Sequence, residues 1–240
     1  MKLEKLKKTN KAGIYEIYID EKKYRIHEET VLKYNLIKDK EIDDIYLKDI
    51  INDNDIFFLI DKVYNYLSRG LKSEKEVRDY LIKQGASNKT ISDIVNKLIS
   101  ERLIDDKIYA ESYLNDKIRF TSDGPFKIRR NLINKGIEEE VIDEALNSYT
   151  RDIEEERIEA ILKDRLKSNN KSLYMFKYYN KNYLFNLGYT TEVINKVITS
   201  FYFDDSEIKE KLVEKLNQKY KDHENKELLV KKKLYEMGFR

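Results

Sequence analysis

Four glycines divide this chain at nearly equal intervals. Gly85, Gly136, Gly188 and Gly238 are 51, 52 and 50 residues apart, and a leucine stands four residues before each of them. The chain has only seven glycines, so random placement would seldom produce this spacing. Periods of this length are typical of small helical units stacked in a row. We therefore predict a tandem repeat whose function lies on an elongated surface and not in one deep pocket.

Other positions follow the same register. Seven residues before each glycine stands a base: Arg78, Arg129, Lys181 and Lys231. Six residues after the first three glycines comes isoleucine: Ile91, Ile142 and Ile194. Ten residues after them the side chain is again apolar: Val95, Leu146 and Ile198. The repeat therefore extends well beyond the leucine and the glycine.

The first repeat is predicted to hold three helices. Apolar residues from Phe57 recur at intervals of three and four, which indicates a first helix. Ser73 followed by Glu76 is typical of a capping box at the start of a second helix, and Gly85 suits the left-handed position just after that helix ends. A third helix is expected over residues 88–101.

The predicted fold is mainly α: tandem three-helix repeats in an elongated, curved array, with a small N-terminal module that contains a β-hairpin. In the module, Tyr15, Ile17 and Ile19 alternate with polar residues before a turn, and the alternation resumes at Tyr24. Pro125 is placed at the start of a helix, where its missing amide is tolerated. The predicted segments are the module 1–54, repeats 55–104, 105–150 and 151–203, and a truncated repeat 204–240.

Composition limits the classes of function. Lys and Arg exceed Asp and Glu by only two, so any contact with a polyanion must be local. The absence of cysteine excludes disulfides and thiolate metal sites. We find neither a secretory signal nor an apolar run long enough for a membrane span, which predicts a cytoplasmic protein that does not contact the membrane.

Catalytic residues are hard to find. None of the motifs GxxxxGK[ST], GxSxG or HExxH occurs, and the two histidines, His27 and His223, are expected to be solvated surface residues. Carboxylates cluster at Asp105–Asp106, Asp204–Asp205 and Glu154–Glu156, where helices are predicted to begin. Acids there cap free amides. The sequence therefore predicts no enzyme, no cofactor and no metal.

One segment is strongly basic. Residues 117–135 contain six bases and the single acid Asp123, in a chain whose net charge is +2. Guanidinium groups form forked bonds to phosphate or carboxylate, so this patch suits a nucleic-acid backbone or an acidic protein. The alternative is a solvated charged surface. The candidate binding residues are Arg78, Lys117, Arg119, Lys127, Arg129, Arg130 and Lys135.

Aromatic residues along the first two repeats are expected to lie in the core, because they recur at helical spacing; base-stacking surfaces are the alternative. They are Phe57, Phe58, Tyr109, Tyr113, Phe120 and Phe126. The leucines and glycines of the repeat are expected to serve packing and capping.

The second repeat resembles the RecX family of recombinase regulators. It begins Arg102-Leu103-Ile104-Asp105-Asp106, followed by Tyr109-Ala110, and continues with Gly124-Pro125-x-Lys127-Ile128-Arg129-x-x-Leu132 and Lys135-Gly136-Ile137. These match the "L-I/L-D-D-x-x-Y/F-A" and "G-P-x-R/K-I-x-x-x-L-x-x-K-G-I" motifs of that family. The resemblance covers residues 60–150, and the third repeat agrees by its spacing.

The resemblance implies a non-enzymatic monomer that lies along the groove of the RecA filament on single-stranded DNA. Such proteins usually limit filament growth, strand exchange, ATP hydrolysis and repressor self-cleavage. The bases of the second repeat would then meet an acidic RecA surface or DNA phosphate. The sign of the regulation and direct contact with DNA stay open, as do two alternatives unrelated to RecA: a general DNA-binding helical protein and a scaffold for protein partners.

Overall fold

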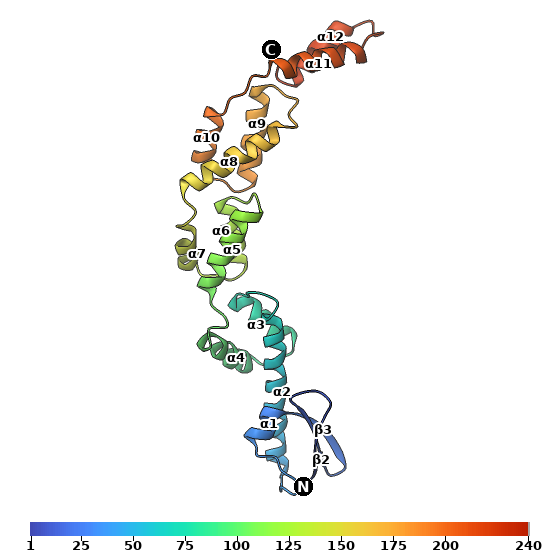
Figure 1. Cartoon of the computed structure of the whole chain (residues 1–240), viewed down its shortest axis with the longest axis vertical. Coiled ribbons are helices and arrows are strands. Elements are labelled where there is room, and N and C mark those ends of the chain that lie inside the picture. Colours follow the sequence, from blue (N-terminus) through green and yellow to red (C-terminus); the bar gives the residue numbers. More distant parts are fainter. Residues whose placement is uncertain (240) are drawn as a thin grey trace. The chain divides into compact units, whose positions relative to one another are not determined.

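The computed structural model describes residues 1–239 and separates into two compact units between Asp106 and Lys107 (Figure 1). The predicted fold class is confirmed in its elements: helices dominate, and a small antiparallel sheet lies near the N-terminus. Unit 1 holds the sheet and the first three-helix group. Unit 2 holds the helices that follow.

Unit 1 begins with a three-stranded sheet in the order β1-β2-β3. Its strands and first helices are β1 (Leu3–Lys8), β2 (Ile14–Ile19), β3 (Lys22–His27), α1 (Glu28–Lys33) and α2 (Asp44–Leu67). Strands β2 and β3 form the predicted hairpin, and the turn between them places Asp20 and Glu21 at positive φ. Strand β1, which the sequence did not predict, pairs with β2 through a register shift between Leu3 and Lys5.

Helix α2 belongs to two hydrophobic cores. Near its start, Leu47 and Ile50 pack with the sheet and α1. Near its end, Val63 packs with α3 (Glu74–Lys83) and α4 (Asn88–Ser100). The segment boundary predicted between residues 54 and 55 falls inside this continuous helix. The predicted capping box at α3 is confirmed: the Ser73 hydroxyl and the Glu76 carboxylate each accept a backbone amide.

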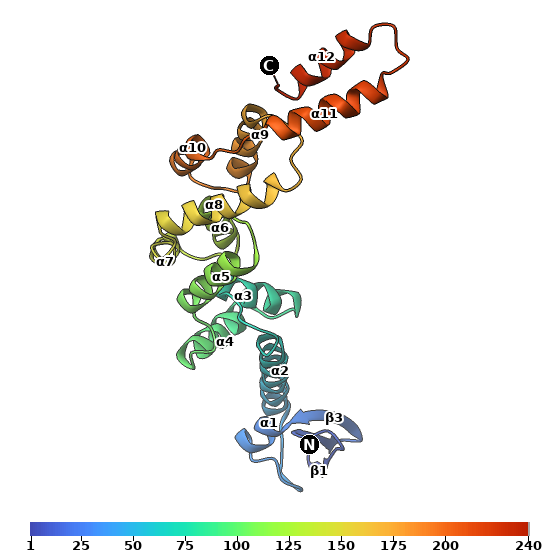
Figure 2. The same ribbon diagram turned by 45° about the horizontal axis from the view of Figure 1, so that its top comes forward.

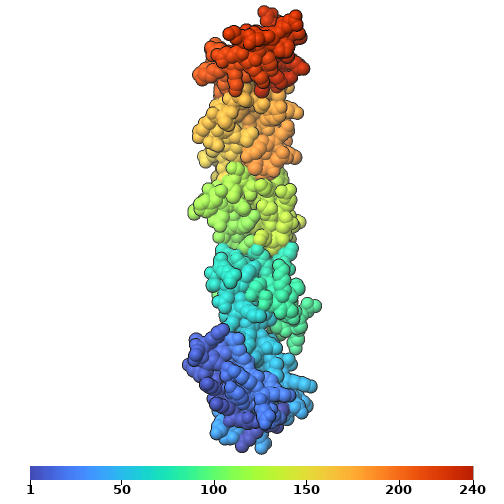
Figure 3. All heavy atoms as spheres, turned by 90° about the vertical axis from the view of Figure 1, so that its right-hand side faces the viewer, coloured from blue at the N-terminus to red at the C-terminus, as the bar shows by residue number. Residues whose placement is uncertain are grey.

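Unit 2 contains two complete three-helix groups and a final helix pair (Figure 2). Its helices are α5 (Asp106–Phe120), α6 (Pro125–Asn134), α7 (Glu139–Leu146), α8 (Arg151–Leu166), α9 (Leu173–Asn186), α10 (Thr191–Ser200), α11 (Ser206–Lys219) and α12 (Lys226–Glu236). Separate cores lie within α5–α7 and within α8–α10. The space-filling view shows these groups as successive bands of side chains, from green to red (Figure 3).

The four repeat glycines end the second helices α3, α6, α9 and α12 in one conformation. Their φ angles lie between +81° and +84°, a left-handed region that glycine enters without steric cost. The glycine amide donates to the carbonyl three residues earlier, and the next amide donates to the carbonyl of the repeat leucine. This is the Schellman arrangement, in which the residue after the glycine is usually apolar. The leucine-to-glycine spacing therefore records how a second helix ends.

Within unit 2 the second helices meet end to end. The amide of Gly124, just before α6, donates to the carbonyl of Leu187 at the end of α9 (2.7 Å). One repeat later, the amide of Ser172, just before α9, donates to the carbonyl of Met237 at the end of α12 (3.0 Å). Free donors at one helix start thus meet free acceptors at another helix end. The same backbone contact relates α6 to α9 and α9 to α12.

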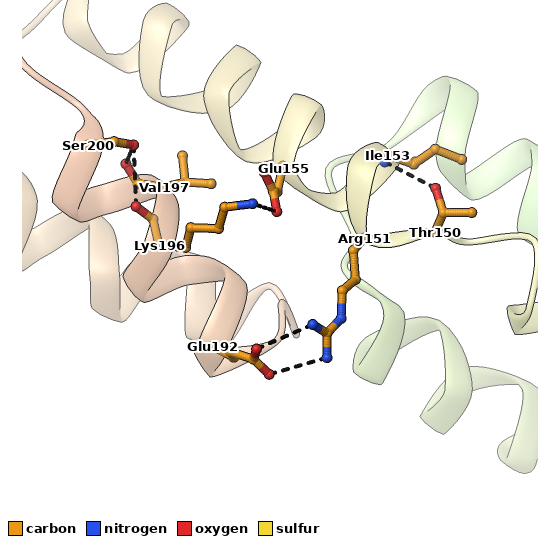
Figure 4. A network of polar contacts seen from close by, with 8 residues as sticks. All are labelled: Thr150, Arg151, Ile153, Glu155, Glu192, Lys196, Val197 and Ser200. Atoms are coloured by element: carbon orange, nitrogen blue, oxygen red, sulfur yellow. Dashed lines mark hydrogen bonds and ion pairs between the residues drawn. The ribbon is translucent and has the colours of Figure 1, made fainter.

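Ion pairs connect the first and third helices of the third repeat at its surface. Arg151 at the start of α8 reaches both carboxylate oxygens of Glu192 on α10, at 3.3 and 3.4 Å (Figure 4). Lys196 on α10 reaches Glu155 on α8 (2.5 Å). Arg151 and Glu192 are both about 70% exposed, so their pairing contributes little stability. The buried cores hold the repeat together.

Candidate partner-binding surface

Four of the clustered carboxylates, those of Asp106, Asp204, Asp205 and Glu154, cap helices. Asp106 Oδ1 accepts the amide of Glu74 at the start of α3 (2.8 Å), and Asp205 Oδ2 accepts the amide of Leu173 at the start of α9 (2.7 Å). Asp204 caps its own helix by accepting the amide and hydroxyl of Ser206, and these bonds hold the pKa of Asp204 below its ordinary value. The predicted capping role is confirmed for these three aspartates. The second aspartate of each pair, however, caps a helix of the preceding repeat.

Glu154 caps a helix in the same manner. Its buried carboxylate accepts both the amide and the hydroxyl of Thr190, just before α10. A buried carboxylate with two donors in place is fully occupied by the fold. Asp106, Asp204, Asp205 and Glu154 therefore each have a capping role in the fold.

Asp123 lies at the centre of the predicted basic patch and is itself buried. Lys127 Nζ is 2.6 Å from Asp123 Oδ1, and Lys117 Nζ is 3.8 Å from Oδ2. The two lysine side chains are only 33% and 26% exposed. They hold the loop between α5 and α6, so they present less charge to a partner than the sequence suggests.

Arg157 of α8 fixes the same loop from the other side. Its guanidinium donates to the carbonyls of Ile118 and Thr121 at the end of α5, the latter at 2.7 Å. A cation at a helix C-terminus complements the helix dipole. Next to it lie Tyr149 and Tyr189, and burial raises the pKa of both phenols. Arg157 is thus a structural arginine. Counting charges along the sequence does not separate such an arginine from one that is free to bind a partner.

The other predicted bases divide into paired and free ones. Arg129 pairs with Asp143 of α7, and Arg78 Nε lies 2.6 Å from Glu74 Oε1 on its own helix. Lys135 is half-buried at the end of α6. Arg119 and Arg130 are exposed, and neither forms an ion pair within residues 1–239.

Two of the six aromatic predictions are wrong. Phe120 is 78% exposed and Phe126 is 59% exposed, although both were expected in the core. Tyr109 is buried as predicted. Phe57, Phe58 and Tyr113 are partly buried. Phe120 and Phe126 flank the α5–α6 loop, so helical spacing alone misplaced them.

An exposed apolar stripe follows the solvent side of α6, α9 and α12, and we call it the second-helix stripe. Its members stand ten and three residues before each repeat glycine, which is about two helical turns apart and therefore on one face. They are 45% to 73% exposed: Phe126, Ile133, Tyr178, Phe185, Leu228 and Tyr235. In α3 the matching residues are Lys75 and the exposed Ile82. Grouped exposed apolar residues mark interaction sites.

Bases border this stripe. Six residues before the glycines stand Arg130, Asn182 and Lys232, between the two apolar positions of each helix. Lys181 and Lys231, seven residues before the glycines, lie beside them. All four of these bases are exposed, and none forms an ion pair in the part of the chain that the structure describes. The surface is therefore apolar and cationic in each repeat of unit 2.

His27 is not the surface residue that the sequence suggested. It is buried at the start of α1, where Nδ1 accepts the amide of Glu29 and Nε2 lies 3.1 Å from the Asp61 carboxylate. His223 is exposed, as expected. Residues 1–239 bring together no group of three metal-binding side chains, and no helix among them is long and apolar enough to cross a membrane.

Two of the three-helix groups match known family models. A family model described as RecX, first three-helix domain, matches residues 60–98, and one described as RecX, second three-helix domain, matches residues 105–146. The regulatory protein RecX of Listeria innocua is 33% identical over 86% of this chain and 81% of that protein. The chain belongs to the RecX family. A RecX of Bacillus mycoides is 30% identical over 94% of this chain and 88% of its own length.

Solved RecX structures share the fold. A crystal structure of a regulatory protein RecX has a TM-score of 0.70 and 26% identity, and the match covers 82% of this chain and 98% of that one. RecX from Lactobacillus salivarius has a TM-score of 0.57 and 32% identity over 61% of this chain and 96% of its own. The relatives are named regulatory proteins, which supports a regulatory role for this chain.

The second-helix stripe was not among the surfaces predicted from the sequence. The signal was available three residues before the glycines, where Ile82, Ile133, Phe185 and Tyr235 are all apolar. The repeat leucine stands one position earlier and is buried in α3, α6 and α9. Two adjacent apolar positions on a helix cannot both face one narrow core, because they are about 100° apart around the helix axis. The position three residues before each glycine is therefore expected on an exposed apolar face.

Proposed function

We propose that this RecX protein binds the filament that RecA forms on single-stranded DNA and limits its recombinase, ATPase and co-protease activities. The observation that carries the proposal is the second-helix stripe, which offers the same apolar and cationic surface three times in unit 2. A surface that repeats is best matched by a partner that repeats, as identical filament subunits do. Membership of a family of regulatory proteins supports the choice of RecA.

The chemistry of the stripe specifies the partner surface. Each site pairs large apolar side chains with a free base, so each RecA subunit would offer an apolar depression bordered by carboxylates. Single contacts of this size are weak. Joined on one chain, they add through effective concentration, so binding is strong only where several subunits stand in a row. This favours the filament over free RecA.

Binding to neighbouring subunits explains the proposed inhibition. Filament growth and ATP turnover require subunits to move against one another, and a chain attached to several subunits opposes that movement. No residue of this protein reacts in this scheme. The protein acts as a cytoplasmic monomer without a cofactor, in DNA recombination, repair and the SOS response.

The test measures ATP hydrolysis by RecA on single-stranded DNA as this protein is added. The wild type is expected to inhibit below equal stoichiometry. A stripe variant, Phe126→Ala with Phe185→Ala and Tyr235→Ala, removes one apolar side chain from each repeat of unit 2 and should require about tenfold more protein. The matched control changes Leu32, Ile45 and Tyr202 to Ala, because these are about as exposed as Tyr235, are more exposed than Phe126 and Phe185, and lie outside the stripe.

The basic part of the surface is tested separately with Arg130, Lys181 and Lys232 changed together to Ala. This variant should weaken inhibition more at low salt than at high salt, because it removes exposed charges. A wild type that leaves both hydrolysis and filament length unchanged contradicts the function. A stripe variant that inhibits as well as its control contradicts only the surface. Salt-sensitive binding to duplex DNA without RecA would favour a general DNA-binding protein.

A further inference from the structure

The N-terminal sheet of unit 1 has one buried face and one basic face. Ile17 and Ile19 of β2 are buried in the core, so the alternating residues Glu16 and Tyr18 point to the opposite face. Strand pairing places a base of β1 and a base of β3 on either side of each of them. The six residues of this sheet face are Lys5, Lys7, Glu16, Tyr18, Lys23 and Arg25.

The sheet face keeps most of its charge. Lys23 pairs with Glu16 at 2.7 Å, and the hydrogen bond from Lys23 holds the pKa of Glu16 below its ordinary value. Lys5, Lys7 and Arg25 are exposed and form no ion pair within the described chain. The first 25 residues hold eight Lys or Arg and four Asp or Glu, whereas the remainder of the chain has a net negative charge. The positive charge is therefore concentrated here.

A hollow next to the sheet face extends the basic surface. It measures about 440 Å³ and lies between the end of β1, the β1–β2 loop and β3. Its lining residues include Lys7, Lys8, Lys11 and Arg25, with Glu16 as the single acid. Lys8 and Lys11 are exposed. The sheet face and this hollow together present five bases that form no ion pair in residues 1–239, although Lys7 stands opposite Glu16.

Strand β3 is anchored to α2 by hydrogen bonds and a ring contact. Asn54 of α2 accepts the amide of His27 (2.8 Å) and donates to the carbonyl of Arg25 (3.1 Å). The guanidinium of Arg25 lies 5.2 Å from the ring centre of Phe58 on the same helix. A preorganised surface loses less entropy when it binds than a mobile one does.

We propose that the sheet face binds the phosphodiester backbone of a single-stranded nucleic acid. Lys5, Lys7 and Lys11 contact successive phosphates, and the half-buried ring of Tyr18 supports a base. Lys5 Nζ already lies 5.7 Å from the centre of that ring, so cation and aromatic platform are adjacent. An aromatic ring between bases is typical of single-strand binding, where stacking adds to charge. This site is independent of the second-helix stripe and of RecA.

The test uses the full chain without RecA. Fluorescence anisotropy of a labelled oligothymidylate is measured over a range of salt concentrations. The variant Lys5→Gln with Lys7→Gln and Lys11→Gln should weaken binding at least about tenfold and reduce the slope of log affinity against log salt by about 2, because three phosphate contacts are lost. The matched control, Lys38→Gln with Lys48→Gln and Lys89→Gln, removes equal charge from exposed positions elsewhere in unit 1.

Tyr18→Leu separates stacking from charge. It should weaken binding by about tenfold and leave the salt slope unchanged. The proposal is overturned if the wild type does not bind the oligonucleotide, if the lysine variant binds as the control does, or if duplex DNA binds as tightly as the single strand. Binding of an acidic peptide in place of the oligonucleotide also overturns it. Circular dichroism establishes that each variant is folded, and none of these outcomes depends on RecA inhibition.

Discussion

The α6–α9 junction and the α9–α12 junction each contain the same type of backbone hydrogen bond, but different atoms pack around it. At the first junction the two backbones touch: a β-carbon on Gly124 would lie 2.5 Å from the carbonyl group of Gly188. At the second, a β-carbon on Gly238 would meet side chains instead, Met175 at 2.2 Å and Ser172 at 2.4 Å. Side chains can move aside, whereas backbone cannot. The first junction is therefore the less tolerant one.

A single arginine adds to this difference. Arg157 stands 31 residues before Gly188 and binds carbonyls at the end of α5. The matching residue before Gly238 is Glu207, which pairs with Lys211 on its own helix. The backbone contact is thus common to both junctions, whereas the side chains around it determine how stiff each junction is. We expect α11 and α12 to open more readily than the helices before them.

The largest effect is expected for Gly124→Ala. Gly124 has a φ of −84°, which alanine adopts easily, so only the collision with Gly188 opposes the change. We expect the free energy of unfolding to fall by about 3 kcal/mol, at the upper end for overpacking. Urea unfolding followed by circular dichroism measures it. Ser122→Ala, an exposed change in the same loop, should stay within about 0.5 kcal/mol of wild type. Equal stability of both variants would break the comparison.

Arg157→Met should have the next largest effect. The methionine fills the volume but leaves the carbonyls of Ile118 and Thr121 without their charged donor, at a cost of about 2 kcal/mol. Hydrogen exchange should quicken in residues 121–124. Glu207→Met, at the matching position of the next repeat, should change neither stability nor that exchange. If both variants behave alike, Arg157 does not stiffen the first junction.

Much of the fold could be predicted because it rests on local chemistry. A left-handed helix end favours glycine, so the period of Gly85 and its equivalents located the end of the second helix in each repeat. Strict alternation revealed the β2–β3 hairpin. Strand β1 was missed because only Leu3 and Leu6 are apolar in its six residues, and the register shift after Leu3 disturbs the alternation. The continuity of α2 was missed because its two halves pack in different cores.

The binding surface was harder to predict because exposure depends on distant residues. Charge counting found Arg129 and Arg130 equally well, yet only the fold brings Asp143 to the first and leaves the second free. Phe126 and Ile128 are both apolar on one short helix, and their identity does not say which of them is buried. Alignment of the repeats resolves this, because exposed positions that stay apolar in each copy are not required by the core.

A smaller effect is expected for Gly238→Ala at the second junction. The positive φ of Gly238 costs alanine about 1 kcal/mol, and crowding against Met175 and the Ser172 hydroxyl, which caps α9, adds up to about 1 kcal/mol. Gly85→Ala is the control, since Gly85 has nearly the same φ but nothing within 4 Å of an added β-carbon. The difference between their free energies of unfolding isolates the crowding. A difference above about 2 kcal/mol would make the second junction as rigid as the first.

The smallest effect is expected for Asp205→Ala. It removes the carboxylate that accepts the amide of Leu173, and loss of such a cap costs about 1 kcal/mol. Asp205→Asn keeps an acceptor oxygen and should retain most of that stability. Hydrogen exchange should quicken at the start of α9 in the alanine variant alone, because only that variant leaves the amide unpaired. If Asp205→Ala were as costly as Gly124→Ala, a side-chain cap would matter as much as backbone contact, and the two junctions would be equally stiff.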